Sequence, residues 1–359
     1  MKKNISILLI AVILIGVLAY QLFQQKEEGE IRNSAALEDE LAVHYIDVGQ
    51  ADSTLLEVDG YAILIDAGDW NSTAAIDYLK ELQLEKIDIA IGTHPDSDHI
   101  GQLASIVEQF DVGEVWMSGN ESTSNTFIST LEAVDETGTD YYEPRSGEVF
   151  DVGPIQLEVL YPEEITGKAN EESISLKVTF GDIRLVFTGD AGIKEEQNMI
   201  DSGADLDAEI LHLGHHGSNT STSRAFLKAV SPEVAIYSAG IDNSYGHPHA
   251  EVIALVENEG AEVYGTDVNG TIVLRTDGNS YEIETEKEGI AVEGKNRCID
   301  LNRASSAELQ EIEGIGPAFA EDIVKSRPFV SLEELKEIKG IGQGKLEDIK
   351  DQGLACVGE

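Results

Sequence analysis

The residues with the clearest capacity for chemistry lie in one short run, His94-Pro95-Asp96-Ser97-Asp98-His99. The apolar stretch 87–92 before it predicts a buried strand, and alternation along an extended chain would turn His94, Asp96 and Asp98 to one side. Histidine and carboxylate side chains are ligands that suit Zn²⁺ and Mn²⁺. A polar loop with helix-capping aspartates would explain either aspartate singly, but not two histidines that bracket both. The run therefore predicts a metal site with room for two ions.

The elements that must position this run alternate between strands and helices. Besides 87–92, strands are expected at 41–47, 53–58, 62–66, 114–117, 155–161, 174–180, 183–188, 209–213, 234–238, 262–264, 270–275 and 281–284. Helices are expected at 74–82, 100–109, 194–200, 223–230 and 250–258. Asp59-Gly60, Gly181-Asp182, Asn269-Gly270 and Asp277-Gly278 are typical of hairpin turns. The pattern predicts two sheets with helices outside them.

Further motifs follow in a fixed order, and together with the run they resemble the metallo-β-lactamase fold of the extracytoplasmic domain of the competence protein ComEC and its stand-alone relatives. They are Asp47-Val48-Gly49-Gln50-Ala51-Asp52-Ser53, Leu64-Ile65-Asp66-Ala67-Gly68, Asn170-Glu171-Glu172-Ser173, Thr188-Gly189-Asp190, His215-His216-Gly217-Ser218 and Tyr245-Gly246-His247-Pro248-His249. The usual signature of the fold is His-x-His-x-Asp-His, and Asp96 stands here in place of the second histidine. The resemblance covers about residues 41–285 and implies an α/β fold, the αββα metallo-β-lactamase sandwich.

The resemblance also implies two divalent metal ions, Zn²⁺ or Mn²⁺, with Asp190 bridging them. The implied ligands are His94 and Asp96 for the first ion, Asp98 and His99 for the second, and one of His215 and His216 to complete the second. No histidine lies between His99 and Asp190, so the third histidine usual in the fold is absent. Asn170 and Ser173 stand there instead, which leaves a one-metal enzyme open.

Two metals about 3.5 to 4 Å apart would activate a bridging water and clamp the oxygens of an in-line displacement at phosphorus. The expected catalytic residues are Asp98, Asp190 and His247, and the expected substrate-binding residues are Asn170, Ser173, Ser218, His247 and His249. The last two histidines could bind phosphate or protonate the leaving group, or they could belong to a capped turn before the helix at 250. His44 and His212 lie in expected strands and are interpreted as core histidines.

The last sixty residues contain two related turns, Ile312-Glu313-Gly314-Ile315-Gly316-Pro317 and Ile338-Lys339-Gly340-Ile341-Gly342-Gln343, each between amphipathic helices. Backbone amides at the start of a helix can hold a phosphate, and two equivalent glycine turns argue against glycines that merely end helices. The segment resembles the tandem helix-hairpin-helix module of the competence DNA receptor ComEA, a small all-α domain that binds DNA. The expected DNA contacts are Gly314, Ile315, Gly316, Gly340, Ile341, Gly342 and Lys345. Lys325, Arg327 and Lys339 are further phosphate candidates, or solvated helix charges.

The chain has 359 residues and a net charge of −44. Residues 296–359 hold 8 Lys and Arg against 13 Asp and Glu, a net charge of −5, so the rest carries −39. This balance excludes a broad basic platform for nucleic acid and suggests a saline medium, or simply a soluble acidic surface.

Residues 1–28 read as a signal peptide or an N-terminal membrane anchor, because Ile5 to Phe23 is almost entirely apolar and basic residues precede it. Residues 29–40 read as a stalk, 41–285 as the metallo-β-lactamase-fold domain, 286–298 as a linker and 299–359 as the helix-hairpin-helix domain. The protein would be extracytoplasmic, either secreted or anchored to the outer face of the cytoplasmic membrane. Cys298 and Cys356 frame the last domain, which in an exported protein favours a disulfide over two unrelated thiols.

These observations predict an extracytoplasmic metal-dependent phosphodiester hydrolase, a nuclease acting on DNA in competence, DNA uptake or scavenging. One alternative is a cell-wall or small-molecule phosphodiesterase of the same fold, since an esterase family for choline phosphate also opens with an Asp-Val-Gly-Gln motif. The other is a non-catalytic DNA-capture protein whose metal site is structural, which the missing third histidine keeps open.

Overall fold

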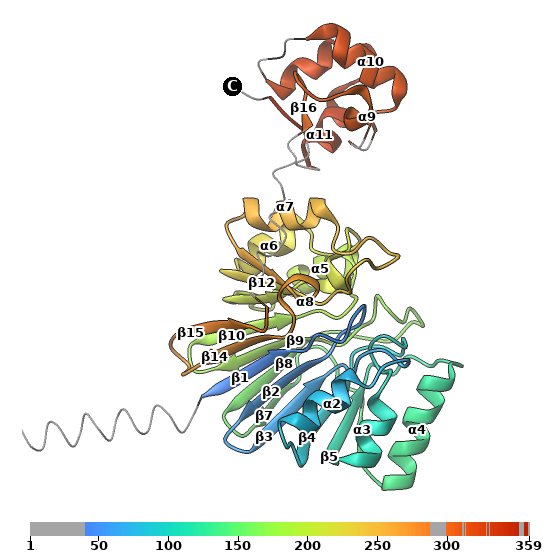
Figure 1. Cartoon of the computed structure of the whole chain (residues 1–359), viewed down its shortest axis with the longest axis vertical. Helices are drawn as coiled ribbons and strands as arrows, with labels where there is room; N and C mark the ends of the chain where they lie inside the picture. The colour runs from blue at the N-terminus through green and yellow to red at the C-terminus, as the bar shows by residue number, and fades with distance from the viewer. Residues whose placement is uncertain are drawn as a thin grey trace, which may run out of the picture.

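The computed structural model describes residues 40–287 and 299–357, apart from 311, 313, 328, 330 and 352–354. Residues 40–287 form two β-sheets that pack face to face, with helices on both outer surfaces (Figure 1). The layered α/β sandwich expected from the sequence is confirmed. In the described part of the chain no helix is long and apolar enough to cross a bilayer, and the apolar segment 5–23 lies outside that part.

The first sheet has eight strands in the order β15-β14-β1-β2-β3-β4-β5-β6. They are β1 (Leu41–Tyr45), β2 (Thr54–Val58), β3 (Tyr61–Ile65), β4 (Lys86–Gly92), β5 (Asp111–Met117), β6 (Asp140–Tyr142), β14 (Ile272–Thr276) and β15 (Tyr281–Thr285). From β3 to β6 the strands run parallel, and parallel neighbours need a crossover that is usually helical. The crossovers are α2 (Ala74–Glu81), α3 (Leu103–Gln109) and α4 (Asn125–Thr137).

The second sheet has seven strands in the order β13-β12-β11-β10-β9-β8-β7. They are β7 (Val149–Val152), β8 (Ile155–Tyr161), β9 (Ser175–Phe180), β10 (Ile183–Phe187), β11 (Ile210–His212), β12 (Val234–Tyr237) and β13 (Glu262–Gly265). The parallel part, β10 to β13, is connected through α5 (Ile193–Asp201), α6 (Arg224–Val230) and α7 (Ala250–Asn258). The short helix α8 (Thr266–Asn269) then leads back to β14 in the first sheet.

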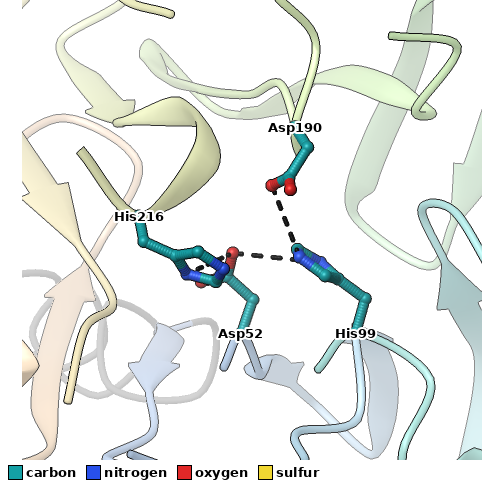
Figure 2. Close-up of side chains that lie close together, drawn as sticks. All are labelled: Asp52, His99, Asp190 and His216. Atoms are coloured by element: carbon teal, nitrogen blue, oxygen red, sulfur yellow. Dashed lines mark ion pairs between the residues drawn. The ribbon is translucent and has the colours of Figure 1, made fainter. Parts of the chain in front are cut away.

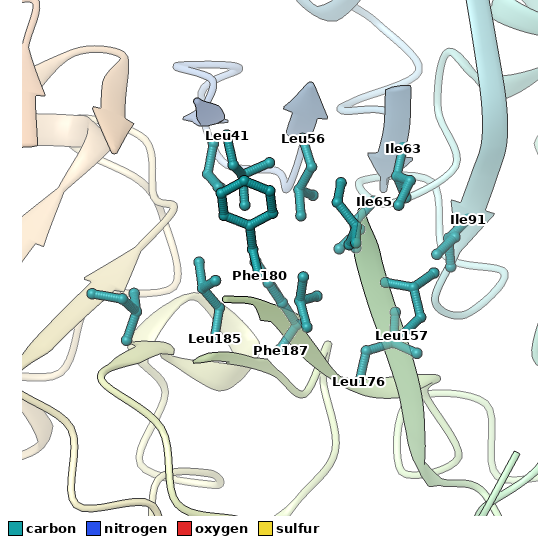
Figure 3. Packing of buried hydrophobic residues seen from close by; sticks show 14 of the residues in the cluster. Leu41, Leu56, Ile63, Ile65, Ile91, Leu157, Leu176, Phe180, Leu185 and Phe187 are labelled. Carbon is teal, nitrogen blue, oxygen red and sulfur yellow. The ribbon is translucent and has the colours of Figure 1, made fainter. Parts of the chain in front are cut away.

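The main core lies between the sheets, because alternate residues of each strand point to that interface (Figure 3). In β1 these residues are Leu41, Val43 and Tyr45, and in β10 they include Leu185 and Phe187, all at most 2 % exposed. The other strand faces pack against the helices in two separate clusters, one on each side. A fully buried side chain of this kind stabilises the fold by about 1.5–3 kcal/mol, so the strands are held firmly beneath the loops that follow them.

The helix α4 and the strands β6 and β7 were missed by the sequence analysis. Ile128 and Leu131 of α4 are 43 % and 37 % exposed, which blurs the apolar stripe by which such a helix is recognised. The signals that were present are its caps: the Ser124 hydroxyl accepts the Phe127 N–H, and Gly138 adopts φ +71° at the end.

Residues 299–357 form a second unit with its own apolar core. Its elements are β16 (Ile299–Asp300), α9 (Ser306–Leu309), α10 (Pro317–Ser326), η2 (Leu332–Glu337), α11 (Gln343–Asp351) and β17 (Ala355–Cys356). The expected helices are present, and a two-stranded parallel pairing of β16 with β17 is added to what was expected as an all-α domain.

Candidate metal centre

The candidate site lies at the carboxyl ends of the parallel strands, where loops from both sheets meet (Figure 2). The loop after β3 lies directly against the loop after β4: Ala67 N–H donates to the His99 carbonyl at 2.6 Å, and Gly101 N–H donates to the Gly68 carbonyl at 2.9 Å. A Cβ atom at Gly101 would come within 2.1 Å of the Trp70 backbone nitrogen, so only glycine permits this approach. The close contact brings Asp66, at the end of β3, beside the His94–His99 run.

Within the run, the expected alternation of an extended chain was wrong. The chain closes a turn, in which the N–H groups of His99 and Ile100 both donate to the Asp96 carbonyl. The turn sends Asp96 and Asp98 in different directions: Asp96 Oδ2 lies 3.8 Å from His94 Nε2, whereas Asp98 Oδ2 lies 3.3 Å from His216 Nε2 and 4.0 Å from His99 Nε2.

His94 and His99 are completely buried, and each is oriented through its Nδ1 atom. His99 Nδ1 lies 2.8 Å from Asp66 Oδ2, while Asp66 Oδ1 accepts the Thr93 N–H at 2.8 Å. His94 Nδ1 lies 3.2 Å from the hydroxyl oxygens of both Thr93 and Ser173. Because the Nδ1 atoms are held in this way, Nε2 of each ring points to the centre. A carboxylate behind a histidine in this manner is typical of metal ligands.

Asp190, which follows β10, lies between these rings. Its Oδ1 atom is 3.3 Å from His99 Nε2, and its Oδ2 atom is 3.7 Å from His94 Nε2 and 3.5 Å from His215 Nε2. Asn170 Nδ2 also donates to Oδ2 at 3.3 Å, and the Asp190 N–H donates to the Ser173 hydroxyl at 3.1 Å. The two oxygens of one carboxylate thus face two different groups of side chains.

His215 and His216 lie in the 3₁₀ turn η1 (Gly214–Gly217) and both have positive φ, +52° and +57°. Two consecutive left-handed residues point the rings apart. His216 Nδ1 is 3.0 Å from the Ser238 carbonyl, which leaves its Nε2 facing Asp98. His215 Nδ1 is 3.1 Å from the Thr220 hydroxyl, and its Nε2 faces Asp190 Oδ2 instead. His216 therefore lies on the His99 side of the centre, and His215 on the His94 side.

Asp52 is a member of the cluster that the sequence analysis did not assign a role. Single ligand atoms of Asp52, His99, Asp190 and His216 lie within 4.8 Å of one another, and all four residues are buried. Asp52 Oδ2 is 3.5 Å from His216 Nδ1 and 3.9 Å from His99 Nδ1 (Figure 2). Asp52 Oδ1 is 3.5 Å from His212 Nε2. Asp52 belongs to the sequence motif 47–53, so its place in that motif was the available signal.

Among the described residues, four buried ligand atoms in the centre have no hydrogen-bond partner: His94 Nε2, His99 Nε2, Asp190 Oδ1 and Asp52 Oδ1. Leaving buried polar atoms unpaired is costly, and atoms of this type converge where a cation would satisfy them. Nitrogen and carboxylate donors suit a divalent transition metal. The residues present therefore fit a divalent metal ion.

The carboxylates of the cluster attract positive charge, whereas burial opposes it, and the balance differs from one histidine to the next. Burial, reinforced by His99, lowers the pKa of His94 to about 3, so its ring is neutral. Burial opposes ionisation of Asp190, but the nearby His99 and His94 outweigh it and hold the pKa of Asp190 well below its usual value. Burial also opposes a charge on His216, yet Asp52 and Asp98 raise its pKa to about 9. The positive charge of protonated His216 thus balances part of the negative charge of the carboxylates, as the charge of a bound metal cation would also do.

The residues expected to bind substrate lie in different surroundings. His247 faces the centre, with its ring centroid 5.6 Å from that of His215 and 6.0 Å from that of His216. His249 is turned towards the neighbouring loop, where its Nδ1 atom accepts the Asn219 N–H at 3.0 Å. Ser218 is 2 % exposed and its hydroxyl lies 3.0 Å from the Thr220 hydroxyl, so it supports the loop that also holds His215.

His44 and His212 are buried, as expected of core histidines. His44 Nδ1 lies 2.8 Å from the Tyr78 hydroxyl of α2, away from the centre. His212 lies beside the centre, with its Nε2 atom 3.2 Å from the Ser238 hydroxyl and 3.5 Å from Asp52.

In the second unit the two glycine turns have equivalent shapes. Gly314 and Gly340 adopt φ of +85° and +104°, and nothing would obstruct a Cβ at Gly316 or Gly342. Ile315 and Ile341 are 2 % exposed, and their N–H groups donate to the Ile312 and Ile338 carbonyls. These two isoleucines therefore shape the turns from inside and do not present their side chains to a ligand.

The basic residues of that unit are partly engaged within it. Lys345 Nζ donates to the Gly314 carbonyl at 2.9 Å and lies 4.9 Å from the centre of the Phe319 ring, so it connects the two turns. Arg327 donates to the carbonyls of Leu301 and Ala304, and Lys325 pairs with Glu321 at 3.2 Å.

Cys298 lies outside the described residues, and of Cys356 only the backbone is described. The pairing of β16 with β17 places Asp300, two residues after Cys298, opposite Cys356.

Comparison with known proteins agrees with this geometry. The metallo-beta-lactamase superfamily matches residues 46–241, and the helix-hairpin-helix motif matches residues 294–352. ComE operon protein 3 of Bacillus subtilis is 30 % identical over 259 residues, and competence protein ComA of Neisseria gonorrhoeae is 31 % identical over 245 residues. Each alignment covers 67 % of this chain and 33 % of the relative. Recombination protein 2 of Haemophilus influenzae is 30 % identical over 248 residues, which cover 67 % of this chain and 30 % of the relative.

This chain thus corresponds to about a third of the length of these curated relatives. A helix-hairpin-helix motif follows the sandwich in the sequence. The strand order, the converging ligand atoms and the matched residues agree: the chain belongs to the metallo-beta-lactamase superfamily and resembles the ComEC-type competence proteins.

Proposed function

We propose that this protein is an extracytoplasmic metal-dependent phosphodiester hydrolase that acts as a nuclease on DNA. The observation that carries the proposal is the convergence of His94 Nε2, His99 Nε2 and Asp190 Oδ1, three buried ligand atoms without hydrogen-bond partners. Such a set is what a bound divalent cation, Zn²⁺ or Mn²⁺, would satisfy.

The two sides of Asp190 define two sets of proposed ligands. On the Oδ2 side lie His94, Asp96 and His215, and on the Oδ1 side lie His99, Asp98 and His216. His215 thereby occupies the side on which the usual third histidine is absent, with Asn170 hydrogen-bonded to the same Asp190 oxygen. This arrangement favours two ions over the one-metal alternative.

Divalent metal bound there would lower the pKa of a water molecule and polarise a phosphoryl oxygen. The protein would supply a hydrogen bond from His247. Gln50 Oε1 accepts the Gly240 N–H at 3.0 Å, so its amide nitrogen is the atom that faces His247 Nδ1 at 3.4 Å. Since Nδ1 accepts that hydrogen bond, the proton of the neutral ring is on Nε2.

Burial, followed by the charges of His216 and His215, lowers the pKa of His247 to about 4. The ring is therefore neutral at neutral pH, which argues against protonation of the leaving group and for a hydrogen bond from Nε2–H to a phosphoryl oxygen.

DNA is favoured over a cell-wall or small-molecule phosphodiester because the chain carries a helix-hairpin-helix motif and is similar to proteins named for competence. The same relatives support a location outside the cytoplasm, where a membrane-anchored or a secreted form would both meet incoming DNA. The paired glycine turns at Gly314 and Gly340 are the proposed grip on the DNA backbone.

Purified residues 29–359 should degrade DNA only with a divalent metal present. We would compare single- and double-stranded DNA with Zn²⁺, Mn²⁺ and Mg²⁺, and measure bound metal in the same samples. Asp190→Ala should abolish cleavage and lower the bound metal, with circular dichroism as the check on folding. DNA bound with metal present but never cleaved would favour the non-catalytic capture protein, and cleavage of small phosphodiesters alone would favour the other alternative.

A further inference from the structure

We infer that loop 240–249 is a stacking platform for an unpaired base beside the metal centre, so that the substrate is single-stranded nucleic acid. This inference rests on the proposed function and specifies its substrate. It assigns a role to Tyr245, an exposed aromatic residue that the proposed chemistry does not use.

The platform is a ladder of rings that begins in the metal centre. The His216 and His247 rings lie 6.0 Å apart with an angle of 28° between their planes, and the His247 and Tyr245 rings lie 5.8 Å apart at 22°. These are offset stacked arrangements, for which separations of about 4.5–7 Å are usual. Tyr245 is 69 % exposed, so the ladder ends at the surface on a broad aromatic face.

The loop that carries Tyr245 is held in place by the side chains of Asn243 and Gln50. Asn243 accepts the N–H groups of Tyr245 and His247 through its Oδ1 atom, each at 3.1 Å, and donates through Nδ2 to the carbonyls of Gly240 and His247. Gln50 fixes the start of the loop by accepting the Gly240 N–H. An aromatic side chain on a loop pinned in this way loses little freedom when a ring stacks on it.

The charge of the centre explains why stacking would be needed there. Among the described residues, the ion pairs and hydrogen bonds around the centre involve carboxylates, imidazoles, hydroxyls and amides, and none involves lysine or arginine. Asp242 adds a further acid to the loop itself. Phosphate contacts to lysine or arginine therefore cannot position a strand here, whereas base stacking on an aromatic ring does not depend on charge.

Stacking on Tyr245 also selects between forms of DNA. In a duplex, both faces of every internal base are covered by its neighbours, and exposing one costs a few kcal/mol. A base next to the cleaved phosphodiester can reach Tyr245 freely only in a single strand, a loop or a frayed end.

The test uses a protein of residues 29–359 and an oligonucleotide that contains 2-aminopurine. The fluorescence of 2-aminopurine is quenched by stacking. Binding is measured with metal removed by a chelator, so that the result does not depend on cleavage. Tyr245→Ala should reduce the quenching and weaken single-strand binding by about tenfold, since stacking on one aromatic residue contributes about 1–3 kcal/mol. Tyr245→Trp should retain both.

Tyr141→Ala is the matched control, because Tyr141 is an exposed tyrosine of β6 whose hydroxyl donates to Glu143 at 3.2 Å. With metal restored, Tyr245→Ala should lower kcat/KM for a single-stranded oligonucleotide about tenfold and leave that for an abasic strand unchanged. Unaltered quenching and affinity in Tyr245→Ala would overturn the inference, as would equal cleavage of blunt duplex and single strands. Absence of any cleavage with normal quenching would count against the nuclease but not against the platform.

Discussion

Asp66 Oδ2 lies 2.8 Å from His99 Nδ1, and this contact sets the direction of the most central ring of the site. Asp66 itself has φ +59°, an uncommon value for a residue with a side chain, at the point where β3 ends. Its other oxygen is occupied by the Thr93 N–H. A strained residue is thus fixed between two loops so that His99 presents Nε2 to the centre.

Asp66→Asn should lower metal affinity by about 10- to 100-fold without unfolding the protein, because an amide can place an N–H where His99 needs an acceptor. Isothermal titration with Zn²⁺ and Mn²⁺ measures the effect. Asp69→Asn is the matched control, since the Asp69 carboxylate accepts a hydrogen bond only within its own loop, from the Asn71 N–H. Wild-type affinity in Asp66→Asn would show that Asp66 does not orient a ligand.

His215→Ala and His216→Ala should each remove a different metal. The side chains lie on opposite sides of Asp190, so each variant should retain one ion per chain if the wild type binds two. Elemental analysis after dialysis gives the number, and Co²⁺ absorption distinguishes the environment that remains. Two ions retained in His215→Ala would exclude that histidine as a substitute for the missing ligand.

Glu172 should make the loop that carries Asn170 and Ser173 sensitive to acid. Its carboxylate, on a residue 3 % exposed, accepts the N–H groups of Thr166, Gly167 and Lys168. Burial opposes ionisation, but these hydrogen bonds outweigh it and lower the pKa of Glu172. A lowered folded-state pKa gives stability that is complete above the unfolded value, near 4.3, and is lost as the pH falls through the folded value.

Glu172→Gln should therefore be less stable than wild type at pH 7, and the difference should shrink as the pH falls below about 4. Urea unfolding at several pH values gives the difference in free energy. Glu171→Gln serves as the control because Glu171 is exposed. A difference that is the same at every pH would mean that the charge of Glu172 is not what stabilises the loop.

Much of the fold and the contiguous ligands could be predicted from the sequence, for physical reasons that differ from residue to residue. Strands such as β1 and β10 are recognisable as short, mostly apolar runs because both of their faces are largely buried. His94 and His99 are recognisable because they lie in one run of six residues with Asp96 and Asp98 between them. The place of Asp52 in the motif 47–53 is a local signal, but its contacts with His99, His212 and His216 arise only when the loop between β1 and β2 lies beside the other loops of the site.

The sequence also could not predict that His215 and His216 lie on different sides of the metal centre. This difference depends on two consecutive positive φ values, which few sequences favour for histidine, and on the hydrogen bond from His216 to the Ser238 carbonyl. Tertiary contacts of this kind decide that His215 faces Asp190 and His216 faces Asp98.

Cys298 and Cys356 should form a disulfide in the exported protein. The pairing of β16 with β17 places the backbone that follows Cys298 beside Cys356. Closing a loop of about 58 residues would contribute roughly 4 kcal/mol in the chain-entropy model. Thiol titration of the unreduced, denatured chain should detect no free thiol. Cys356→Ser should lower the melting temperature of the unit formed by residues 299–357, and only under oxidising conditions. Two titratable thiols per chain would rule the disulfide out.

Deleting residues 299–359 should weaken DNA binding far more than it slows cleavage of a small phosphodiester at saturation. The deleted part contains both glycine turns and carries a net charge of −6, whereas the remainder carries −38. Salt acts in two directions, because it screens the grip on phosphate but also relieves repulsion between DNA and the acidic body. The salt dependence of the full chain should therefore be shallow from about 0.05 to 1 M salt. Fluorescence anisotropy of labelled DNA with the full chain and with the deletion variant measures the loss of affinity and its salt dependence. Equal affinities of the two proteins would mean that the helix-hairpin-helix unit does not capture DNA.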